Sequence, residues 1–460
     1  MLIESFVDEK LGNSSYLVAS ELTRQAVVID PERDIDRYVR VADGLGLRLT
    51  HTLDSHLHAD FVSGARELAA QYGVLIGASA EARLAFDHLP LQARDELSLG
   101  DLKIQVVATP GHTPEHISFA VVPEKAPAPA AIFTGGALIV GGAARTDLLG
   151  HHLTGPLTHL LYETIHELLR YPDDVAVYPT HGAGSFCNAP ASTDRVTTIG
   201  RERQSNPLAF AESEKEFAEW ALANLPSYPT YFAYLRAVNQ LGPTILNGLP
   251  ILEPLSPRVV RERMAQGILV VDTRAPREFA SGHIPNAYGI PLGAPLVTWA
   301  GWVIPFRAPL ILVGENANAR EKAVRQLIRI GYDDLRGYLD GGMAAWENEG
   351  LPVTRVPLMS VADLHGARER GDSTRVLDVR QDSEWQAGHL PHAMHVEGGR
   401  LPAIELPMPN AEPIVVHCAH GDRSTVATSI LERRGFGNVR LLDGGFSAWQ
   451  AAGYPVTREG

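Results

Sequence analysis

The sequence predicts an α/β protein made of several domains, and three observations lead to this prediction. The chain has 460 residues, which is too many for one compact core. Short apolar runs alternate with amphipathic helical patterns along most of its length. The last 200 or so residues contain an internal repeat. We therefore expect three domains, at residues 1–248, 249–356 and 357–460.

The composition is that of ordinary globular domains, with 45% apolar and 20% charged residues. The net charge of −14 argues against nucleic acid or an acidic membrane as a general partner, because a polyanion requires a basic surface. We find no run of eighteen apolar residues and no signal-peptide pattern. With only two cysteines, Cys187 and Cys418, a disulfide framework is not expected and a cytoplasmic location is.

The first domain shows strands and helices in alternation. An apolar run at 26–30 predicts a buried strand, and the pattern after it predicts a helix that ends in glycine. Further strands are predicted at 103–110, 117–122, 130–135 and 175–179, and a long amphipathic helix at 157–171. The connector at 226–258 is rich in proline and glycine, and we expect it to pack on the first domain.

The remaining chain is a tandem repeat. Residues 270–292 match residues 376–396, and residues 339–355 match residues 442–458. Both copies predict a small α/β domain. We call residues 249–356 the first repeat and residues 357–460 the second repeat.

The sharpest signal is a cysteine between a strand and a helix in the second repeat. PIVVH at 413–417 predicts a buried strand, and STVATSILERRG at 424–435 predicts a helix. Cys418 therefore lies on a tight loop that opens a helix, where backbone N–H groups and the helix dipole stabilise a thiolate. Arg423 adds a positive charge across the loop. A thiolate in this setting can accept a sulfane sulfur and hold it as a persulfide.

The second repeat resembles the rhodanese family through LDVR at 377–380, EWQAGHLPHA at 384–393, CAHGDRS at 418–424 and LDGGFSAW at 442–449. The resemblance implies that Cys418 carries sulfur, with Arg423 in the same loop. The other members of that loop are Ala419, His420, Gly421, Asp422 and Ser424. One alternative is a structural buried cysteine. Another is a phosphatase of the same fold, but phosphatases have one more residue between Cys and Arg.

The first repeat has no thiol. Gly314 falls where Cys418 lies, and Ala319 falls where Arg423 lies. Covalent sulfur transfer is therefore not expected there, and a packing module is the favoured interpretation. The family frame is kept at Asp272, Arg274, Glu278, Gly282 and His283.

Histidines recur at predicted strand ends in the first domain. HTLDSHLHADFVSG covers 51–64, TPGHTPEH covers 109–116 and YPTHGAGSFC covers 178–187. Histidines two residues apart, joined by one from a distant loop, can form a metal-binding face. We predict His56, His58 and His112 as this face, with His181 as a fourth candidate.

These motifs, together with FTGGALIVGGAARTD at 133–147, resemble the metallo-β-lactamase superfamily over about the first 240 residues. The resemblance implies an αββα sandwich, and it is strongest to persulfide dioxygenases and to the related glyoxalase II hydrolases. Fusion to two rhodanese modules, the first without cysteine, resembles sulfide-detoxifying proteins of the CstB type.

In persulfide dioxygenases two histidines and an aspartate hold one iron, and the histidines correspond to His56 and His112. Two positions depart from the superfamily pattern. Phe61 replaces a ligand of a second metal, and Gly136 replaces the aspartate. The resemblance thus implies one Fe(II), or zinc on an imidazole face, with weak or absent occupancy because the carboxylate is missing. His116 is a substitute to consider.

The leading interpretation is a sulfur-metabolism fusion. A rhodanese sulfurtransferase would be joined to a persulfide dioxygenase-like domain with a degenerate metal site, which acts on or binds low-molecular-weight thiol persulfides. Thiosulfate and sulfite are further expected small-molecule partners, and a homo-oligomer is open. One alternative is a first domain that binds a persulfide or a partner and supplies Cys418 without catalysis. Another is a zinc thioester hydrolase of the glyoxalase II type.

Overall fold

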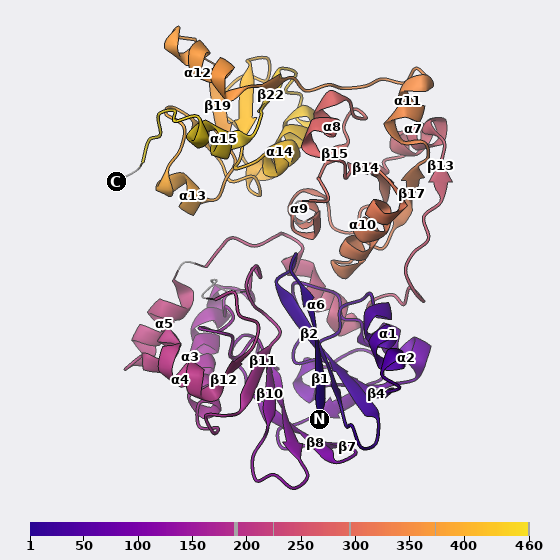
Figure 1. Cartoon of the computed structure of the whole chain (residues 1–460), viewed down its shortest axis with the longest axis vertical. Helices are drawn as coiled ribbons and strands as arrows, with labels where there is room; N and C mark the ends of the chain where they lie inside the picture. Colours follow the sequence, from indigo (N-terminus) through magenta and orange to yellow (C-terminus); the bar gives the residue numbers. More distant parts are fainter. Residues whose placement is uncertain (188–191, 224, 294–295, 373, 459–460) are drawn as a thin grey trace. The chain divides into compact units, whose positions relative to one another are not determined.

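The computed structural model (Figure 1) describes residues 1–187, 192–223, 225–293, 296–372 and 374–458. By its internal contacts the chain divides into two compact units. One unit comprises residues 1–249 with Ile328–Gly331, and the other comprises the rest of the chain. Within the described ranges, no helix has both the length and the apolarity that crossing a membrane requires.

The first unit is a sandwich of two six-stranded sheets, which confirms the predicted αββα class. One sheet has the order β1 (Leu2–Asp8), β2 (Asn13–Ala19), β3 (Gln25–Ile29), β4 (Arg48–Leu53), β5 (Leu75–Ser79), β6 (Leu89–Leu91). The other has the order β12 (Thr197–Thr198), β11 (Ala176–Pro179), β10 (Ala131–Gly135), β9 (Ile117–Pro123), β8 (Leu102–Ala108), β7 (Glu96–Leu99). The facing sides of the sheets bury one apolar core, which includes Tyr16, Ile29, Leu53, Ile104 and Phe133.

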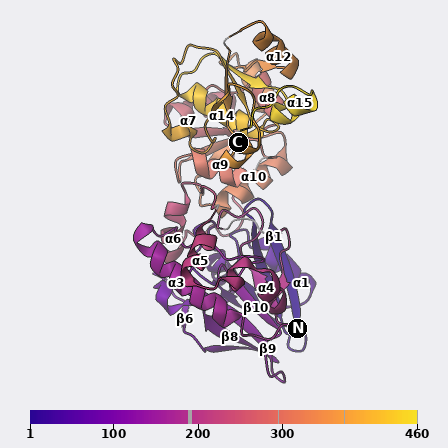
Figure 2. The same ribbon diagram turned by 90° about the vertical axis from the view of Figure 1, so that its left-hand side faces the viewer.

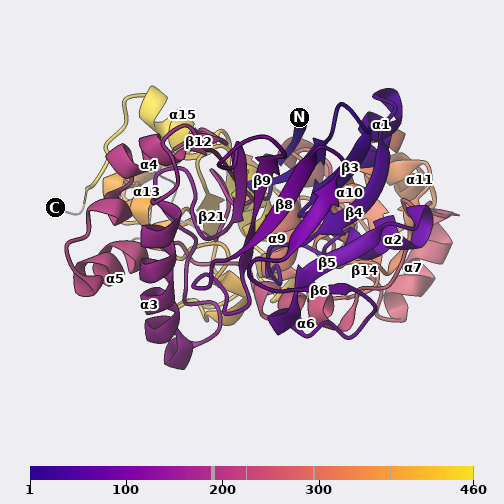
Figure 3. The same cartoon turned by 90° about the horizontal axis from the view of Figure 1, so that it is seen from below.

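Helices cover both outer faces of the sandwich, as Figure 3 shows. Val28 of the first sheet packs with apolar side chains of α1 (Asp36–Gly44) and α2 (Ala65–Tyr72). The second sheet packs against α3 (His151–Leu168), α4 (Ile199–Ser205) and α5 (Glu214–Leu222), and α3 and α5 lie side by side (Figure 2). The predicted connector contains α6 (Phe232–Leu241), which packs within this unit.

Two helices differ in extent from the sequence prediction. The long helix α3 begins at His151, six residues before its predicted start, and includes Pro156. The helix after Cys418, α14 (Asp422–Arg433), begins two residues before its predicted start. Gly421 has a φ of 133°, and this turn lets the helix start directly after it.

The second unit contains two parallel five-stranded sheets of identical topology. The first repeat has the order β13 (Pro254–Leu255), β17 (Leu335–Leu339), β16 (Leu310–Val313), β14 (Leu269–Asp272), β15 (Tyr288–Gly289). Its helices are α7 (Pro257–Ala265), α8 (Pro276–Ser281), α9 (Leu296–Val303), α10 (Ala317–Arg329) and α11 (Gly342–Asn348).

The second repeat has the order β18 (Leu358–Met359), β22 (Val439–Leu442), β21 (Ile414–His417), β19 (Arg375–Asp378), β20 (Met394–His395). Its helices are α12 (Val361–Glu369), α13 (Asp382–Ala387), α14 and α15 (Gly445–Ala451). Because β21 is the central strand, the loop after it lies in the middle of the row formed by the carboxyl ends of the strands. α/β folds carry their sites at these strand ends.

Candidate functional site

Cys418 directly follows the central strand β21 and is buried, with 2% of its surface exposed. The N–H of Gly421 donates to its Sγ atom at 3.1 Å, and Ser424 Oγ lies 3.6 Å from the same sulfur. Ser424 Oγ itself donates to the carbonyl oxygen of Gly421 at 2.8 Å, so the Gly421 N–H is the donor aimed at the sulfur. The loop predicted from sequence thus surrounds Cys418.

A glycine behind the loop allows close packing. The N–H of Phe446 donates to the carbonyl oxygen of Cys418 at 2.8 Å. A Cβ atom on Gly445 would lie 2.4 Å from that oxygen, and Gly445 has a φ of 59°. Only glycine meets both demands, which explains the Gly-Gly pair in LDGGFSAW.

Arg423 is not free in the loop, because Glu384 of α13 holds its guanidinium in a two-pronged ion pair. Arg423 Nη2 donates to Glu384 Oε1 at 2.8 Å, and Nη1 donates to Oε2. Burial raises the pKa of Glu384, but Arg423 outweighs it and the net shift is downward. The sequence places Glu384 in the motif at 384–393 but does not predict its pairing with Arg423. Its signal was the conserved register of Glu278 and Glu384 in the two repeats.

His417 ends strand β21 and is fully buried beneath the loop. Its Nε2 atom lies 3.6 Å from Asp378 Oδ2. Burial lowers the pKa of His417 to about 4, although Asp378 acts in the opposite direction. The imidazole is therefore neutral at pH 7.

The matching loop of the first repeat is occupied differently. A Cβ atom on Gly314 would lie 3.2 Å from both Arg320 Cγ and Thr273 Oγ1. The Arg320 guanidinium stacks over Tyr338, 3.9 Å from the ring centre. The position that corresponds to Cys418 therefore has little room for a sulfur atom.

In the first unit, three histidines from three loops meet. His56 follows β4, His112 follows β8 and His181 follows β11, and all three are buried. One ring nitrogen of each lies within 4.8 Å of the others. The structure thus groups His181, the fourth candidate, with His56 and His112.

Each of these rings is held by its Nδ1 atom. His112 Nδ1 donates to the carbonyl oxygen of Arg145 at 2.6 Å. His181 Nδ1 faces Asn13 Oδ1 at 3.1 Å. His56 Nδ1 lies 2.9 Å from Ser55 Oγ, which itself donates to Asp30 and so accepts from the histidine. With the protons on Nδ1, all three Nε2 atoms present lone pairs to one another.

The Nε2 atoms of His56 and His181 are only 3.3 Å apart. Two unprotonated nitrogens at this distance repel each other unless a cation binds both. Burial lowers the pKa of His112 to about 3 and that of His56 well below its ordinary value, so neither imidazole carries a proton on Nε2 at pH 7. This donor set suits one metal ion.

His58, which we predicted as a ligand, turns toward Asp30 instead. Its Nε2 lies 3.2 Å from Asp30 Oδ1. Its Nδ1 is buried and has no hydrogen-bond partner among the described residues. His58 belongs to two further groups that could hold a metal ion, one with Asp60 and His181 and one with Asp30 and Asp54. Asp30, directly after β3, is not singled out by the sequence, because an acidic residue after a buried strand is common.

Phe61 and Asp60 complete the surroundings of His58 and His181. Phe61 is fully buried and stacks on His58, with ring centres 4.1 Å apart. Asp60 lies 3.4 Å from His181 Nδ1 and accepts from Asn13 Nδ2 at 2.7 Å. A phenyl ring where the superfamily has a histidine removes one donor from a second metal position.

His116 uses both of its nitrogens elsewhere. Its Nε2 accepts from the N–H of Gly136 at 3.0 Å, and its Nδ1 lies 2.9 Å from Thr109 Oγ1. It therefore does not replace the missing carboxylate.

Gly136 packs tightly against the His112 ring. A Cβ atom on Gly136 would lie 2.6 Å from His112 Cδ2 and 3.0 Å from Ala144 Cβ. Any side chain at position 136 requires the His112 ring to move, and that ring is held by Arg145. The residue at position 136 and the orientation of the His112 ring are thus coupled.

The connector helix α6 fixes the histidine loop from outside. Asn239 Nδ2 donates to the carbonyl oxygens of His58 and Phe61 at 2.8 and 2.9 Å. The Tyr231 hydroxyl donates to the carbonyl oxygen of Asp60 at 2.9 Å. The predicted packing of the connector on the first domain is confirmed by these bonds.

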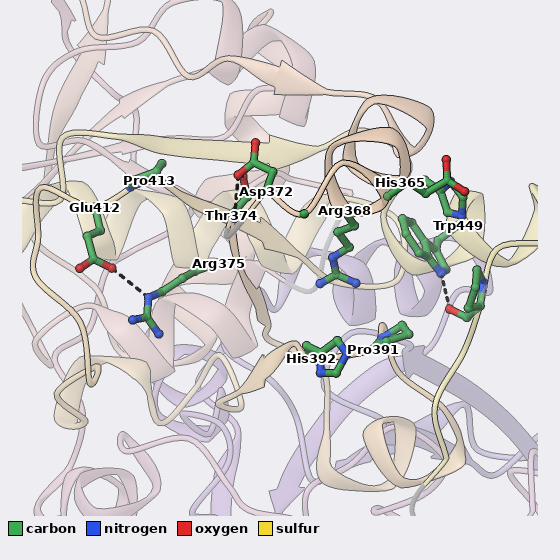
Figure 4. A pocket seen from close by; sticks show the side chains of 13 residues that line it. His365, Arg368, Asp372, Thr374, Arg375, Pro391, His392, Glu412, Pro413 and Trp449 are labelled. Atoms are coloured by element: carbon green, nitrogen blue, oxygen red, sulfur yellow. Dashed lines mark hydrogen bonds and ion pairs between the residues drawn. The ribbon is translucent and has the colours of Figure 1, made fainter.

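A wide cavity of about 1040 Å³ lies elsewhere in the second repeat (Figure 4). Arg375, where β19 begins, and Pro413, just before β21, line it, whereas Cys418 follows β21. The strands are parallel, so this cavity lies at the opposite sheet edge from the thiol. The dashed ion pair between Arg375 and Glu412 spans 2.9 Å.

Comparison with known families divides the chain in the same way. The family model of the rhodanese-like domain matches residues 256–349 and 360–452. The first half is 29% identical over 214 residues to the mitochondrial persulfide dioxygenase ETHE1 of Homo sapiens, covering 46% of this chain and 77% of that protein.

It is also 30% identical over 211 residues to the hydroxyacylglutathione hydrolase GloC of Haemophilus influenzae, covering 41% of this chain and 90% of that protein. Among solved structures, a metallo-β-lactamase from Staphylococcus aureus has a TM-score of 0.65 and 30% identity. That match covers 74% of this chain and 98% of the other.

Proposed function

Because the chain belongs to the metallo-β-lactamase family over its first half and carries two rhodanese-like domains after it, we propose that it is a sulfur-metabolism fusion enzyme. Its domains would be residues 1–248, 249–356 and 357–460. Cys418 transfers sulfane sulfur, and the histidine domain acts on or binds thiol persulfides of low molecular weight. The observation that carries the proposal is the N–H of Gly421 aimed at Cys418 Sγ.

Transfer takes place in two displacements at sulfur. The Cys418 thiolate attacks the sulfane sulfur of thiosulfate, the S–S bond breaks, and sulfite leaves with the electron pair. A thiol persulfide reacts in the same way and releases its thiolate. The Cys418 persulfide then gives its outer sulfur to an acceptor nucleophile, and the thiolate is restored. The donors from Gly421 and the loop stabilise the sulfur anion in both states.

The test is Cys418→Ser in the full chain, assayed by thiocyanate formation from thiosulfate and cyanide. We expect activity to fall to background, because a hydroxyl at this position is a poor sulfur nucleophile. Cys187→Ser is the matched control. Burial raises the pKa of the Cys187 thiol well above its ordinary value, so this cysteine should not react. Native activity in Cys418→Ser would refute the assignment.

The first domain is proposed to bind one metal ion through His56, His112 and His181. Three neutral imidazoles fit zinc well. They do not reproduce the two-histidine, one-carboxylate set of a persulfide dioxygenase, because Gly136 provides no side chain. A set of two histidines and one carboxylate supplies oxygen activation when it holds iron. With three imidazoles instead, we expect weak or absent persulfide oxidation and substoichiometric iron.

Metal analysis distinguishes the two possible ligand sets. We expect His181→Gln to reduce bound metal strongly and His58→Gln to reduce it less, because only His181 points its Nε2 at that of His56. Comparable loss in both variants would favour the trio of His56, His58 and His112. Vigorous persulfide-dependent O₂ uptake by the native protein would show that the missing carboxylate is not needed.

A second candidate function is persulfide binding without oxidation, in which the first domain supplies Cys418. The observation that favours it is Gly136, which provides no carboxylate and packs tightly against the His112 ring. In this case the native protein would bind glutathione persulfide without consuming O₂. A third candidate, thioester hydrolysis, is suggested by the similarity to GloC. Release of glutathione from S-lactoylglutathione would identify it.

A further inference from the structure

A pocket of about 370 Å³ lies beside the Cys418 loop and is formed by both repeats. From the second repeat it is lined by Gly421 and Ser424, the two residues whose polar atoms contact the sulfur. From the first repeat it is lined by Ala275, Pro276 and Arg277, at the start of α8. The repeat without a thiol thus forms one wall of the pocket next to the thiol.

This wall is firmly attached to the second repeat. Pro276 is the neighbour that a side chain at position 421 would meet, since an added Cβ atom would lie 3.7 Å from Pro276 Cβ. Behind it, buried His283 faces Glu432 Oε2 at 2.9 Å, and the Arg433 guanidinium stacks over Tyr288 at 4.1 Å. Figure 1 shows α8 beside α14, which starts at the loop.

The charges of the pocket depend on one residue of the first repeat. Arg277 is the one arginine or lysine among the described residues that line the pocket, and Asp422 and Asp443 are its acidic residues. Arg277 Nη2 donates to the two carboxylate oxygens of Asp443 at 3.1 and 2.9 Å. Its side chain remains 75% exposed, so it can also contact a ligand.

Arg423, the cation of the loop itself, is paired with Glu384, faces Cys418 within the loop and does not line the pocket. An anionic sulfur donor that enters here therefore meets Arg277 as its positive charge. Thiosulfate carries its charge on the sulfonate end, away from the sulfane sulfur that Cys418 attacks. Arg277, in the wall of the pocket that adjoins the Cys418 loop, can bind that end.

We propose that Arg277 of the first repeat is a substrate-binding residue of the sulfurtransferase site, where it binds the anionic end of the sulfur donor beside Cys418. The inference rests on the proposed sulfurtransferase function. It gives the first repeat a role beyond packing: it supplies a binding group while the second repeat supplies the nucleophile.

The test compares Arg277→Ala, Asp443→Ala and Arg258→Ala in the full chain with thiosulfate as donor. We expect Arg277→Ala to raise KM for thiosulfate about tenfold and to change kcat little, because binding charge is lost and the thiol is untouched. Asp443→Ala should lower KM, since it frees Arg277 from its partner. Arg258, an exposed arginine of the first repeat paired with Glu349, is the matched control and should leave both constants unchanged.

The opposite changes in KM expected for Arg277→Ala and Asp443→Ala distinguish substrate binding by Arg277 from a purely structural ion pair. If both variants raise KM equally, the ion pair only joins the repeats and the inference is wrong. It is also wrong if Arg277→Ala leaves KM unchanged. Absence of Cys418-dependent transfer in the native protein would instead overturn the proposed function itself.

Discussion

In the first repeat Arg274 Nη2 donates to Asp272 Oδ2 at 2.6 Å, and in the second repeat Arg380 Nη2 donates to Asp378 Oδ2 at the same distance. Each arginine also donates to the backbone carbonyl eight residues later, at 2.8 and 2.7 Å. Both aspartates are buried. The two repeats thus keep the same buried ion pair although only one keeps the thiol.

The second shared contact is at the far end of each domain. Trp346 Nε1 donates to the carbonyl oxygen of Pro352 at 2.8 Å, and Trp449 Nε1 donates to that of Pro455 at 2.8 Å. Both indoles are buried in the core of their repeat. In each repeat this hydrogen bond joins the last helix to the segment that follows it.

The loops after the central strands are where the repeats differ. Cys418 has Gly421 and Ser424 around its sulfur, whereas Gly314 has the Arg320 side chain in front of it. The two repeats thus share the contacts that stabilise the fold and differ in the one short loop on which the proposed sulfur transfer depends. The following experiments test that separation.

The largest effect is expected from moving the thiol. In Gly314→Cys combined with Cys418→Ser, we expect sulfur transfer to stay at background, because Ala319 offers no cation and Arg320 Cγ would lie close to the new side chain. Thiocyanate formation measures this. Recovery of substantial activity would mean that a thiol alone enables the loop of the first repeat to transfer sulfur. That result would contradict the proposed difference between the two loops.

The next effect concerns the arginines of the two loops. Arg423→Ala should lower kcat/KM for thiosulfate by about 10- to 100-fold, because the loop loses a charge-assisted contact and Glu384 is left without its partner. Arg320→Ala in the first repeat should leave kcat/KM unchanged. Equal losses would show that the first loop participates directly in transfer.

The shared ion pairs should matter equally in both repeats. Asp272→Ala and Asp378→Ala should each destabilise the protein by about 3 kcal/mol, since each leaves a largely buried arginine unpaired. Urea unfolding of the full chain measures this. Asp334→Ala, which removes an exposed pair with Arg336, is the control and should cost less than about 1 kcal/mol. A large effect in only one repeat would show that the two buried ion pairs do not contribute equally to stability.

The smallest effect is a pH dependence specific to the second repeat. His417 has a pKa of about 4 in the folded protein and 6.5 as its ordinary value, so the unfolded chain binds the proton more tightly. Above pH 6.5 His417 is neutral in both states, and the stability of the folded protein is complete. As the pH falls toward 4, the unfolded chain takes up the proton first, and the free energy of unfolding falls. In His417→Val, which copies Val313 of the first repeat, the urea midpoint should fall less between pH 7 and pH 5. An unchanged slope would contradict this.

The sequence was most informative where the functional residues are contiguous. Cys418, Gly421 and Ser424 lie within seven residues, so the strand and helix on either side determine their geometry. Glu384 is 39 residues from its partner Arg423, and only the fold brings the two together. The internal repeat predicted the architecture of the second unit because both copies bury the same pattern.

The histidine site was harder to predict because its members come from three loops. His58 was favoured by its nearness to His56 in sequence, but Asp30 lies beside it and holds its Nε2. His181 joins His56 and His112 from the end of β11. Spacing alone does not tell which nitrogen of a ring faces inward, since that depends on acceptors such as Asn13 and Ser55 from other segments.

Because Gly136 packs against the His112 ring, the effect of a substitution at position 136 depends on where that ring lies. With the ring in its present place, a Cβ at position 136 would overlap His112 Cδ2, so Gly136→Asp adds a carboxylate only by displacing an imidazole. The same aspartate would therefore have different consequences in a relative whose ring lies elsewhere. A carboxylate at position 136 would join the three histidines only if the surroundings of His112 changed as well, so the single substitution is not expected to add a ligand to the present set.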